Sequence, residues 1–349
     1  MRVTNYTPFP MLCFEGRGVH DEPFDTVVAR VTLDLGAHRV LRLSQEQAPL
    51  AFRDEWHGET ARSSVRTESD LAPSKPGADV VVVGSARAPG GVAARAWDVR
   101  VKVGPVEKAL RVTGPRAWVR GPRGYVLTEP EPCTEVPLRY ELAYGGTVRD
   151  GERELACEGN PWGLGYVPSV AHERRERVDA PRIEDPRDPV GEIGKAHRPE
   201  GFGVWARTWA PRLQRAGTYD DAWLRERWPV LPTDFDFAYW NFAHPDLIAP
   251  APFQGDEAIE LDGVDPAGPR RHQLPGHDVF LLAGGDDEAD VRPMRVDAVL
   301  VDLDRATVAL VYRCVLPRPQ TAWVELRMEF RDPDETEARL DGASATATR

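Results

Sequence analysis

Carboxylates are the residues of this sequence whose type and spacing come closest to a catalytic pattern. They cluster in "DFDF" (234–237), "GDE" (255–257) and "GGDDEADV" (284–291). Two carboxylates at a suitable separation can hydrolyse a glycosidic bond. The chain has 56 Asp and Glu residues, however, and turns favour Asp, so such pairs also arise without catalysis. A carboxylate-dependent glycan hydrolase therefore remains an alternative function, with the candidate acids Asp234, Asp236, Asp256 and Glu257.

Other catalytic and metal-binding patterns are absent from the sequence. The eight histidines form no HxH, HxxxH or HExxH motif, and the four cysteines form no CxxC pair. Ser85 lies in "VGSARAP", which lacks the GxSxG pattern of a nucleophile elbow. We therefore expect no catalytic residue, no metal site and no cofactor.

The segment "SDLAPSKPGADVVVVGSARAP" (69–89) has a lysine and glycines near a strand, as phosphate-binding loops do. Its order is wrong for such a loop, because Lys75 precedes Gly77 and the strand-like run follows both. The prolines favour extended backbone, Gly77 permits a turn, and the run 80–83 predicts a strand buried on both faces. Asp70 and Lys75 could pair across this turn or contact backbone groups, in a structural role.

Charge and composition exclude several kinds of partner. The net charge of −12 argues against nucleic acid and against anionic membrane surfaces, although "RRERVDAPR" (174–182) is one small basic candidate. No apolar run approaches the roughly 20 residues of a membrane span. The first residues do not resemble a secretory leader, and the scattered cysteines suit a reducing compartment. We expect a cytoplasmic protein.

Alternating apolar and polar residues predict a mainly β protein. Segments 27–35, 97–103 and 324–330 show a period of two, which is typical of antiparallel strands. Two hairpins are predicted, at 97–114 around a Gly-Pro turn and at 296–316 around residues 304–306. We expect antiparallel β-sandwich-like sheets with a loop-rich centre and a few short helices.

The middle of the chain looks different from both ends. Residues 145–215 are rich in Gly, Pro and charge. A short helix is predicted near 218–228, with Thr218 as its N-cap and Pro229 after its end. The expected organisation is a β-rich part at 1–150, a loop-rich connector at 151–230, a β-rich part at 231–332 and a disordered tail at 333–349. Aromatic residues in the centre suit a binding surface, and the candidate partner contacts are Trp162, Trp205 and Trp209.

An ordered series of phrases resembles one bacterial family. It begins with "NYTPFP" (5–10) and the segment 69–89, and continues through "VPLRYELAYGG" (136–146), "NPWGLGY" (160–166) and "PRIEDP" (181–186). The longest similar stretch covers 201–243, and "GDEAIEL" (255–261) follows. Together these phrases resemble the type VI secretion accessory proteins, a family catalogued as a domain of unknown function. The resemblance extends from about residue 5 to about residue 315.

The resemblance implies a non-enzymatic adaptor or chaperone. Such a protein would hold a secreted effector in the cytoplasm and help load it onto the spike, with the effector and spike or PAAR proteins as partners. A structural component of the secretion spike is a further alternative. The oligomeric state stays open. The family phrases contain residues that we expect to be structural: Asp70, Pro73, Lys75, Pro76, Gly77, Asp79, Gly145, Gly146, Asn160, Pro161, Gly217, Thr218, Tyr219, Asp220, Trp223, Asp234, Asp236 and Asn241.

Overall fold

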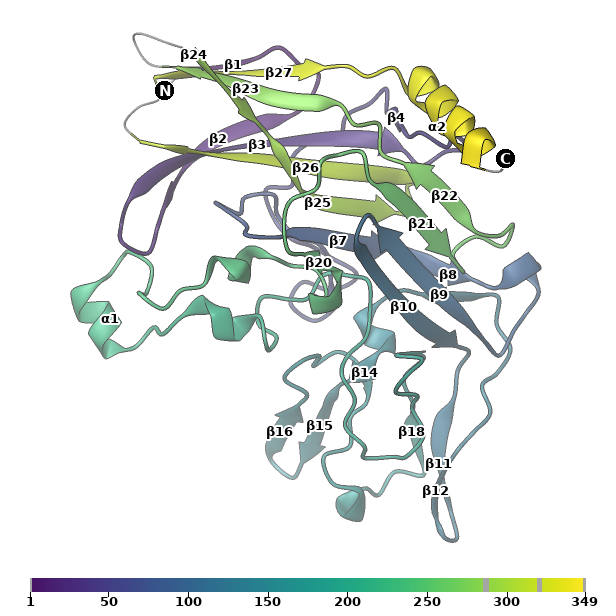
Figure 1. Ribbon diagram of the computed structural model, residues 1–349. Helices are drawn as coiled ribbons and strands as arrows, with labels where there is room; N and C mark the ends of the chain where they lie inside the picture. The colour runs from purple at the N-terminus through teal and green to yellow at the C-terminus, as the bar shows by residue number, and fades with distance from the viewer. Residues whose placement is uncertain (1, 285–288, 319–321, 348–349) are drawn as a thin grey trace.

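Strands dominate the structure, a computed structural model that describes residues 2–284, 289–318 and 322–347 (Figure 1). Most strand pairs are antiparallel, which confirms the mainly β prediction. Two α-helices occur within the described residues, α1 (Asp221–Glu226) and α2 (Pro333–Ala347). Neither of these helices has the length and apolar character that a membrane crossing requires.

The largest sheet has seven strands. Its order is β2-β3-β26-β25-β7-β20, with β4 paired to β3 off this path. The bounds are β2 (Met11–Arg17), β3 (Pro23–Asp34), β4 (Arg42–Leu43), β7 (Ala78–Val83), β20 (Ile248–Ala249), β25 (Arg295–Asp302) and β26 (Thr307–Pro317).

Two further sheets flank this one. The four-stranded sheet contains β1 (Arg2–Asn5), β27 (Trp323–Glu329), β23 (Asp278–Gly284) and β24 (Ala289–Pro293). The five-stranded sheet contains β19 (Ile183–Glu184), β10 (Val106–Thr113), β9 (Ala96–Val103), β21 (Ala258–Asp262) and β22 (Arg270–Gln273).

The two β-rich ends of the chain share their sheets. Strand β7 pairs in parallel with β25, β3 pairs with β26, and β9 pairs with β21. The purple and yellow-green strands therefore lie side by side in Figure 1. One large apolar cluster runs through these sheets and includes Val28, Val82, Val99, Leu261 and Leu310, each almost completely buried. The boundaries at residues 150 and 230 do not separate one sheet system from another.

Both predicted hairpins are confirmed. Strands β9 and β10 pair with Val103 opposite Val106, and β25 and β26 pair with Val301 opposite Val308. The predicted strand after the proline-rich turn is β7, and all six of its residues are buried. An apolar run without alternation therefore marks a strand that is covered on both faces.

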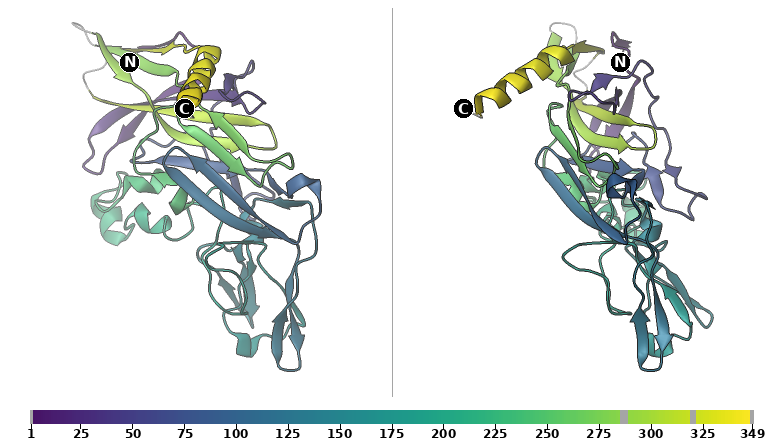
Figure 2. Two further views of the ribbon diagram at one scale, coloured as in Figure 1. Left: turned by 45° about the vertical axis from the view of Figure 1, so that its right-hand side comes forward. Right: turned by 90° about the vertical axis from the view of Figure 1, so that its right-hand side faces the viewer.

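The centre of the chain is more structured than a connector. Short strands between residues 117 and 179 form a three-stranded sheet and two two-stranded pairs, and Trp118, Val167 and Val178 pack in a second small core. Two further two-stranded pairs use strands from residues 55–67 and 85–137. Most of the teal strands between residues 117 and 179 form the lower end of the molecule in both views of Figure 2. The short strands are β5 (Glu55–Trp56), β6 (Val65–Thr67), β8 (Ser85–Arg87), β11 (Ala117–Gly121), β12 (Gly124–Leu127), β13 (Glu135–Pro137), β14 (Tyr144–Gly145), β15 (Thr147–Asp150), β16 (Arg153–Ala156), β17 (Leu164–Gly165) and β18 (Arg177–Asp179).

Six 3₁₀ turns connect the strands. They are η1 (Pro89–Gly91), η2 (Tyr140–Leu142), η3 (Val170–His172), η4 (Leu213–Ala216), η5 (Phe237–Trp240) and η6 (Pro245–Leu247) within the described part of the chain.

Two local expectations differ from the structure. The predicted helix exists as α1, but its N-cap is Asp220, whose side chain accepts a hydrogen bond from the backbone N–H of Trp223. Thr218 instead binds Asp234. The tail from residue 333, expected to be disordered because it is polar, forms α2. Arg42 of β4 and Asp334 of α2 form an ion pair, and Arg39 pairs with Asp341, so charged contacts attach the helix to the segment around β4.

Candidate functional site: a central pocket and an exposed aromatic arm

A buried ion-pair network underlies the proline-rich turn at 73–77. Lys75 Nζ lies 2.9 Å from Asp79 Oδ2 and 3.7 Å from Asp297 Oδ1, and Asp297 also pairs with Arg313. All four side chains are at most 4 % exposed. Two acids and two bases balance one another, as buried charges require. Lys75 therefore has a structural partner and is not free to bind phosphate.

Asp70 and Lys75 do not pair with each other. Asp70 accepts hydrogen bonds from the side chain of Arg30 (3.0 Å) and the backbone N–H of Ala51 (2.7 Å). Nearby, the carbonyl of Pro73 accepts a hydrogen bond from Thr26 Oγ1. The turn is therefore attached to β3, whereas Lys75 points inward toward β7.

The same network holds a distant segment in place. Asp79 Oδ1 accepts hydrogen bonds from the backbone N–H groups of Phe242 and Ala243, with an N–O distance of 3.0 Å in each. Asn241 Nδ2 donates to the carbonyl of Gly77 (2.9 Å), and Lys75 Nζ lies 4.0 Å from the centre of the Phe242 ring. Gly77 must be glycine, since a Cβ there would lie 2.5 Å from the carbonyl oxygen of Ala249. These contacts join two of the family phrases.

A pocket of about 320 Å³ opens beside this junction, and we call it the central pocket. Its lining comes from residues 76–77, from 205–215 and from 238–250, the last of which includes edge strand β20. Most of the lining atoms are apolar, and Arg215 is the exposed charged group. An apolar concave surface with few polar groups is the usual form of a binding site.

Arg212 fixes the wall of the central pocket. Its guanidinium makes two hydrogen bonds to Glu68, at 2.6 and 2.7 Å, and others to the carbonyls of Trp205 (2.8 Å) and Tyr239 (2.7 Å). Burial alone would raise the pKa of Glu68, but the ion pairs with Arg212 and Arg207 lower it. The Arg212 guanidinium is thus engaged within the protein, and it ties segments 205–212 and 238–241 of the pocket wall to the buried Glu68.

A projecting segment begins at the pocket, and we call residues 213–233 the α1 arm. In Figure 1, α1 lies at the outer left edge of the molecule, away from the sheets. The arm is held by polar contacts: Trp223 Nε1 donates to the carbonyl of Val230 (2.9 Å), and Arg227 donates to the carbonyls of Leu231 and Val19. Gly217 (φ 80°) lets the chain turn where Thr218 binds Asp234. These contacts give the arm a defined shape without an apolar core.

The arm exposes large apolar side chains. Tyr219, Leu224 and Trp228 are 52 %, 57 % and 66 % exposed. Trp223 lies between the two aromatic rings, with centroid distances of 4.7 Å to Tyr219 and 5.7 Å to Trp228. A contiguous exposed aromatic group is costly in water and typically marks a protein interface. Among the described residues, the arm is therefore a candidate protein-binding surface.

Two of the three tryptophans proposed as partner contacts lie in the core. Trp205 and Trp209 are 3 % and 1 % exposed, and with Tyr140 they form an edge-to-face aromatic cluster in the core. Trp162 is partly buried against the same core. Trp205 reaches only the floor of the central pocket. Burial, which sequence does not report, separates these residues from the exposed aromatics of the arm.

The glycine-rich family phrases form a structural junction of their own. Asn160 Nδ2 donates to the carbonyls of Tyr140 (2.7 Å) and Tyr144 (3.0 Å). Gly145 has a φ of 149°, and a Cβ there would lie 2.2 Å from the carbonyl oxygen of Asn160. Gly146 likewise has a φ of 117°. The carbonyl of Pro161 accepts a hydrogen bond from Thr147 Oγ1, so these residues bind one another.

The four candidate acids make local structural contacts. Asp234 accepts two hydrogen bonds from Thr218, and Asp236 caps η5 by accepting from the N–H of Ala238. The Glu257 carboxylate accepts hydrogen bonds from two backbone N–H groups of its own turn. The carbonyl of Asp256 accepts from the side chain of Gln273. The carboxylates of Asp234, Asp236 and Glu257 thus have roles in local turns, and this geometry does not favour the hydrolase alternative.

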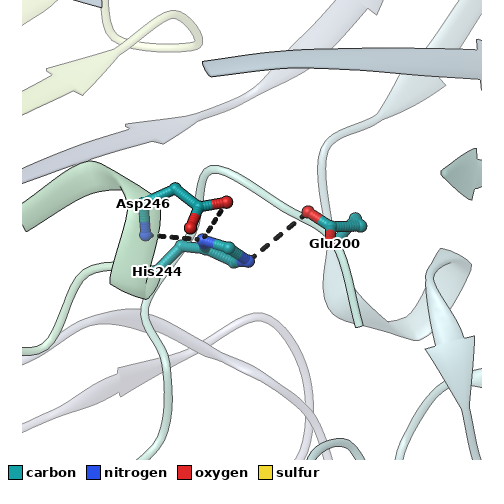
Figure 3. A group of neighbouring side chains, drawn as sticks. All are labelled: Glu200, His244 and Asp246. Atoms are coloured by element: carbon teal, nitrogen blue, oxygen red, sulfur yellow. Dashed lines mark hydrogen bonds and ion pairs between the residues drawn. The ribbon is translucent and has the colours of Figure 1, made fainter. Parts of the chain in front are cut away.

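One constellation of side chains was not found from sequence. Glu200, His244 and Asp246 place ligand atoms within 4.8 Å of one another (Figure 3). His244 Nε2 lies 3.4 Å from Glu200 Oε2, and His244 Nδ1 accepts from the backbone N–H of Asp246 (3.1 Å). Segments 197–200 and 244–246 are distant in sequence, so no short sequence motif could have predicted the cluster.

Two bases already neutralise this cluster. Lys108 Nζ contacts the Glu200 carboxylate and lies 3.0 Å from Asp246 Oδ2, and Arg198 pairs with both acids. Burial, with Lys108 and Arg198 nearby, holds the pKa of His244 well below its ordinary value, so the imidazole is neutral. A divalent cation would have to displace the Lys108 ammonium. The arrangement is best described as a cluster of ion pairs that joins β10 to the wall of the central pocket.

Burial makes two of the cysteine thiols poorly reactive. All four lie in the described part of the chain and are free, and burial raises the pKa of Cys13 and Cys314 to about 11. These two thiols stay protonated at neutral pH and are poor nucleophiles.

Neither the curated proteins nor the solved structures gave a match. A family described as "Uncharacterized protein conserved in bacteria (DUF2169)" matches residues 20–313, which include the central pocket, the α1 arm and the buried network at Lys75. The chain therefore belongs to the bacterial family DUF2169.

Proposed function

We propose that this protein is a non-enzymatic adaptor or chaperone of a type VI secretion system. It binds a secreted effector in the cytoplasm and helps load it onto the spike and PAAR proteins. The resemblance of the ordered sequence phrases supports the biological setting. The exposed aromatic group of the α1 arm is the observation that carries the binding role.

The arm supports binding because the rings of Tyr219 and Trp228 are exposed and belong to no apolar core. Its shape is maintained by the Asp220 cap and by the hydrogen bonds of Trp223 and Arg227. The rings of Tyr219 and Trp228 could therefore be smaller without loss of a core. Side chains of this size and exposure commonly supply the largest share of binding energy at an interface. The adjoining central pocket offers space for an apolar side chain of the same partner.

Affinity purification from the native host tests the proposal. The tagged wild-type protein should recover an effector or PAAR protein in near-stoichiometric amount, identified by mass spectrometry. The double variant Leu224→Ala/Trp228→Ala should recover at least about tenfold less, since interface hot spots each contribute about 2 kcal/mol or more. Phe52→Ala is the matched control, because Phe52 is 63 % exposed and lies outside the arm.

Two results would favour other functions. Hydrolysis of a glycan that is lost when Asp234, Asp236, Asp256 and Glu257 are all replaced would favour the hydrolase. Recovery of the protein itself in the secreted spike fraction would favour a structural component of the spike.

A further inference from the structure

A second cavity lies at the lower end of the molecule, apart from the central pocket. It has a volume of about 600 Å³. The β15–β16 hairpin lines one part of it, and residues 167–175, after β17, line the rest. Figure 1 shows β15 and β16 in this lower part, below the large sheets. We call it the lower cavity.

The lower cavity is positively charged. Its lining includes Arg149, His172, Arg174 and Arg175, and Glu173 is its only acid among the described residues. Glu173 is already engaged by Arg175, whose Nε lies 2.9 Å from Oε1, and by two backbone N–H groups. The hydrogen bond with Arg175 lowers the pKa of Glu173 to about 2, so this pair stays ionised and neutral overall.

Two arginines remain uncompensated. Within the residues that the structure describes, the guanidinium groups of Arg149 and Arg174 make no hydrogen bond or ion pair. Glu154 stands opposite Arg149 in the hairpin register, but the two side chains do not form an ion pair. Both arginines are exposed, so their guanidinium groups are accessible to a ligand. The fork of N–H donors in arginine matches a carboxylate in geometry and charge.

We propose that the lower cavity binds an acidic segment of a partner protein. Arg149 and Arg174 each receive a side-chain carboxylate, and the apolar lining from Val148, Leu155 and Val167 accommodates an aliphatic residue between the acids. A nucleic acid fits less well, because the whole chain is acidic and only two cations are free. The inference rests on the proposed function in one respect, that the ligand is a protein.

A labelled eight-residue peptide of alternating Glu and Leu is the probe. Fluorescence anisotropy with the full-length protein should show binding that weakens in 0.5 M NaCl. The double variant Arg149→Gln/Arg174→Gln should lose affinity by a factor of about ten or more, because it removes both charged hydrogen bonds to the carboxylates. The control Arg177→Gln removes an exposed arginine that lies outside the cavity lining and should bind as the wild type does.

Several results would overturn the inference. One is equal affinity for a peptide with Gln in place of Glu, and another is unchanged affinity in the double variant. Tighter binding of inorganic pyrophosphate than of the peptide would assign the cavity to a small anion instead. The arm variant Leu224→Ala/Trp228→Ala should bind the peptide normally. Failure of the proposed function at the arm is thus distinguishable from failure of this inference.

Discussion

Lys75 and Asp79 form an ion pair that is removed from water, with Nζ 2.9 Å from Oδ2 and the two side chains 1 % and 0 % exposed. At the same time, Asp79 accepts hydrogen bonds from the backbone N–H groups of Phe242 and Ala243. The pair therefore determines where the segment 241–250 lies relative to β7, and with it one wall of the central pocket.

Removing the charge of Lys75 should destabilise the protein strongly. Lys75→Met leaves Asp79 buried without its cation, and the free energy of unfolding should fall by about 3–5 kcal/mol. Urea denaturation measures this change. Lys102→Met is the matched control, because Lys102 is 38 % exposed, and it should cost about 1 kcal/mol or less.

The double variant Lys75→Met/Asp79→Asn provides a second comparison for this test. Asn keeps an acceptor for the two backbone N–H groups but carries no charge, so the double variant should be more stable than Lys75→Met alone. An unfolding free energy for Lys75→Met equal to that of Lys102→Met would contradict the account.

Gly145→Ala should prevent the glycine-rich junction from forming. The new Cβ would lie 2.2 Å from the carbonyl oxygen of Asn160, and the φ of 149° disfavours any side chain. We expect a loss of more than about 3 kcal/mol, measured by thermal or urea unfolding. Gly124→Ala is the control: its φ is 121°, but nothing lies within 4 Å of the new Cβ, so only about 1–2 kcal/mol should be lost. Equal losses in the two variants would show that the contact with Asn160 is unimportant.

Acid should weaken the fold through buried histidines. Burial and nearby Arg331 lower the pKa of His277 from 6.5 to about 4. His277 Nδ1 accepts the backbone N–H of Arg331, which requires the neutral ring. Between these pH values the unfolded chain binds a proton that the folded chain does not. Stability is therefore complete above about pH 6.5 and is lost as the pH falls toward 4, by about 3 kcal/mol for this group.

Urea midpoints at pH 7 and pH 5 measure the effect of acid. His277→Asn retains a hydrogen-bond acceptor but cannot take up the proton, so its midpoint should depend less on pH than that of the wild type. Burial lowers the pKa of His57 to about 4 as well, so part of the pH dependence should remain. The same slope in the wild type and in His277→Asn would contradict the assignment to His277.

Lys108→Met should convert the cluster at His244 into a cation site. Without the ammonium group, Glu200, His244 and Asp246 present ligand atoms within 4.8 Å of one another. Zinc accepts such a set of ligands, and at 100 times its Kd it would stabilise the variant by about 2.7 kcal/mol. Melting curves with zinc and with a chelator should differ for Lys108→Met but not for the wild type. Zinc stabilisation of the wild type would show that Lys108 is not the resident cation.

The sequence predicts local structure better than it predicts neighbours. The apolar run at 80–83 and the alternation at 97–103 correctly predict strands, because burial on both faces and burial on one face leave different patterns. No such pattern says that β7 lies between β20 and β25, which come from about residues 248 and 295. The interleaving of the two β-rich ends therefore required the structure.

Side-chain position was the other limit of sequence analysis. Tryptophan serves equally well in a core and at an interface, so Trp205 and Trp228 look alike in sequence although one is 3 % and the other 66 % exposed. The central pocket is assembled from three distant segments, which no short motif reveals. Residues 333–349 are mostly polar, and their sequence therefore predicted disorder. The helix α2 forms there nevertheless, and charged contacts such as that between Arg42 and Asp334 attach it.

The most direct test of the adaptor proposal is effector export from the native host. The deletion strain would be complemented with the wild type, with Leu224→Ala/Trp228→Ala or with Phe52→Ala, and the effector recovered from the medium would be quantified against a secreted spike protein. The account predicts that the arm variant accumulates normally in the cell and exports spike protein, yet exports at least about tenfold less effector than the other two strains. Equal export of effector by all three strains would contradict the role assigned to the α1 arm.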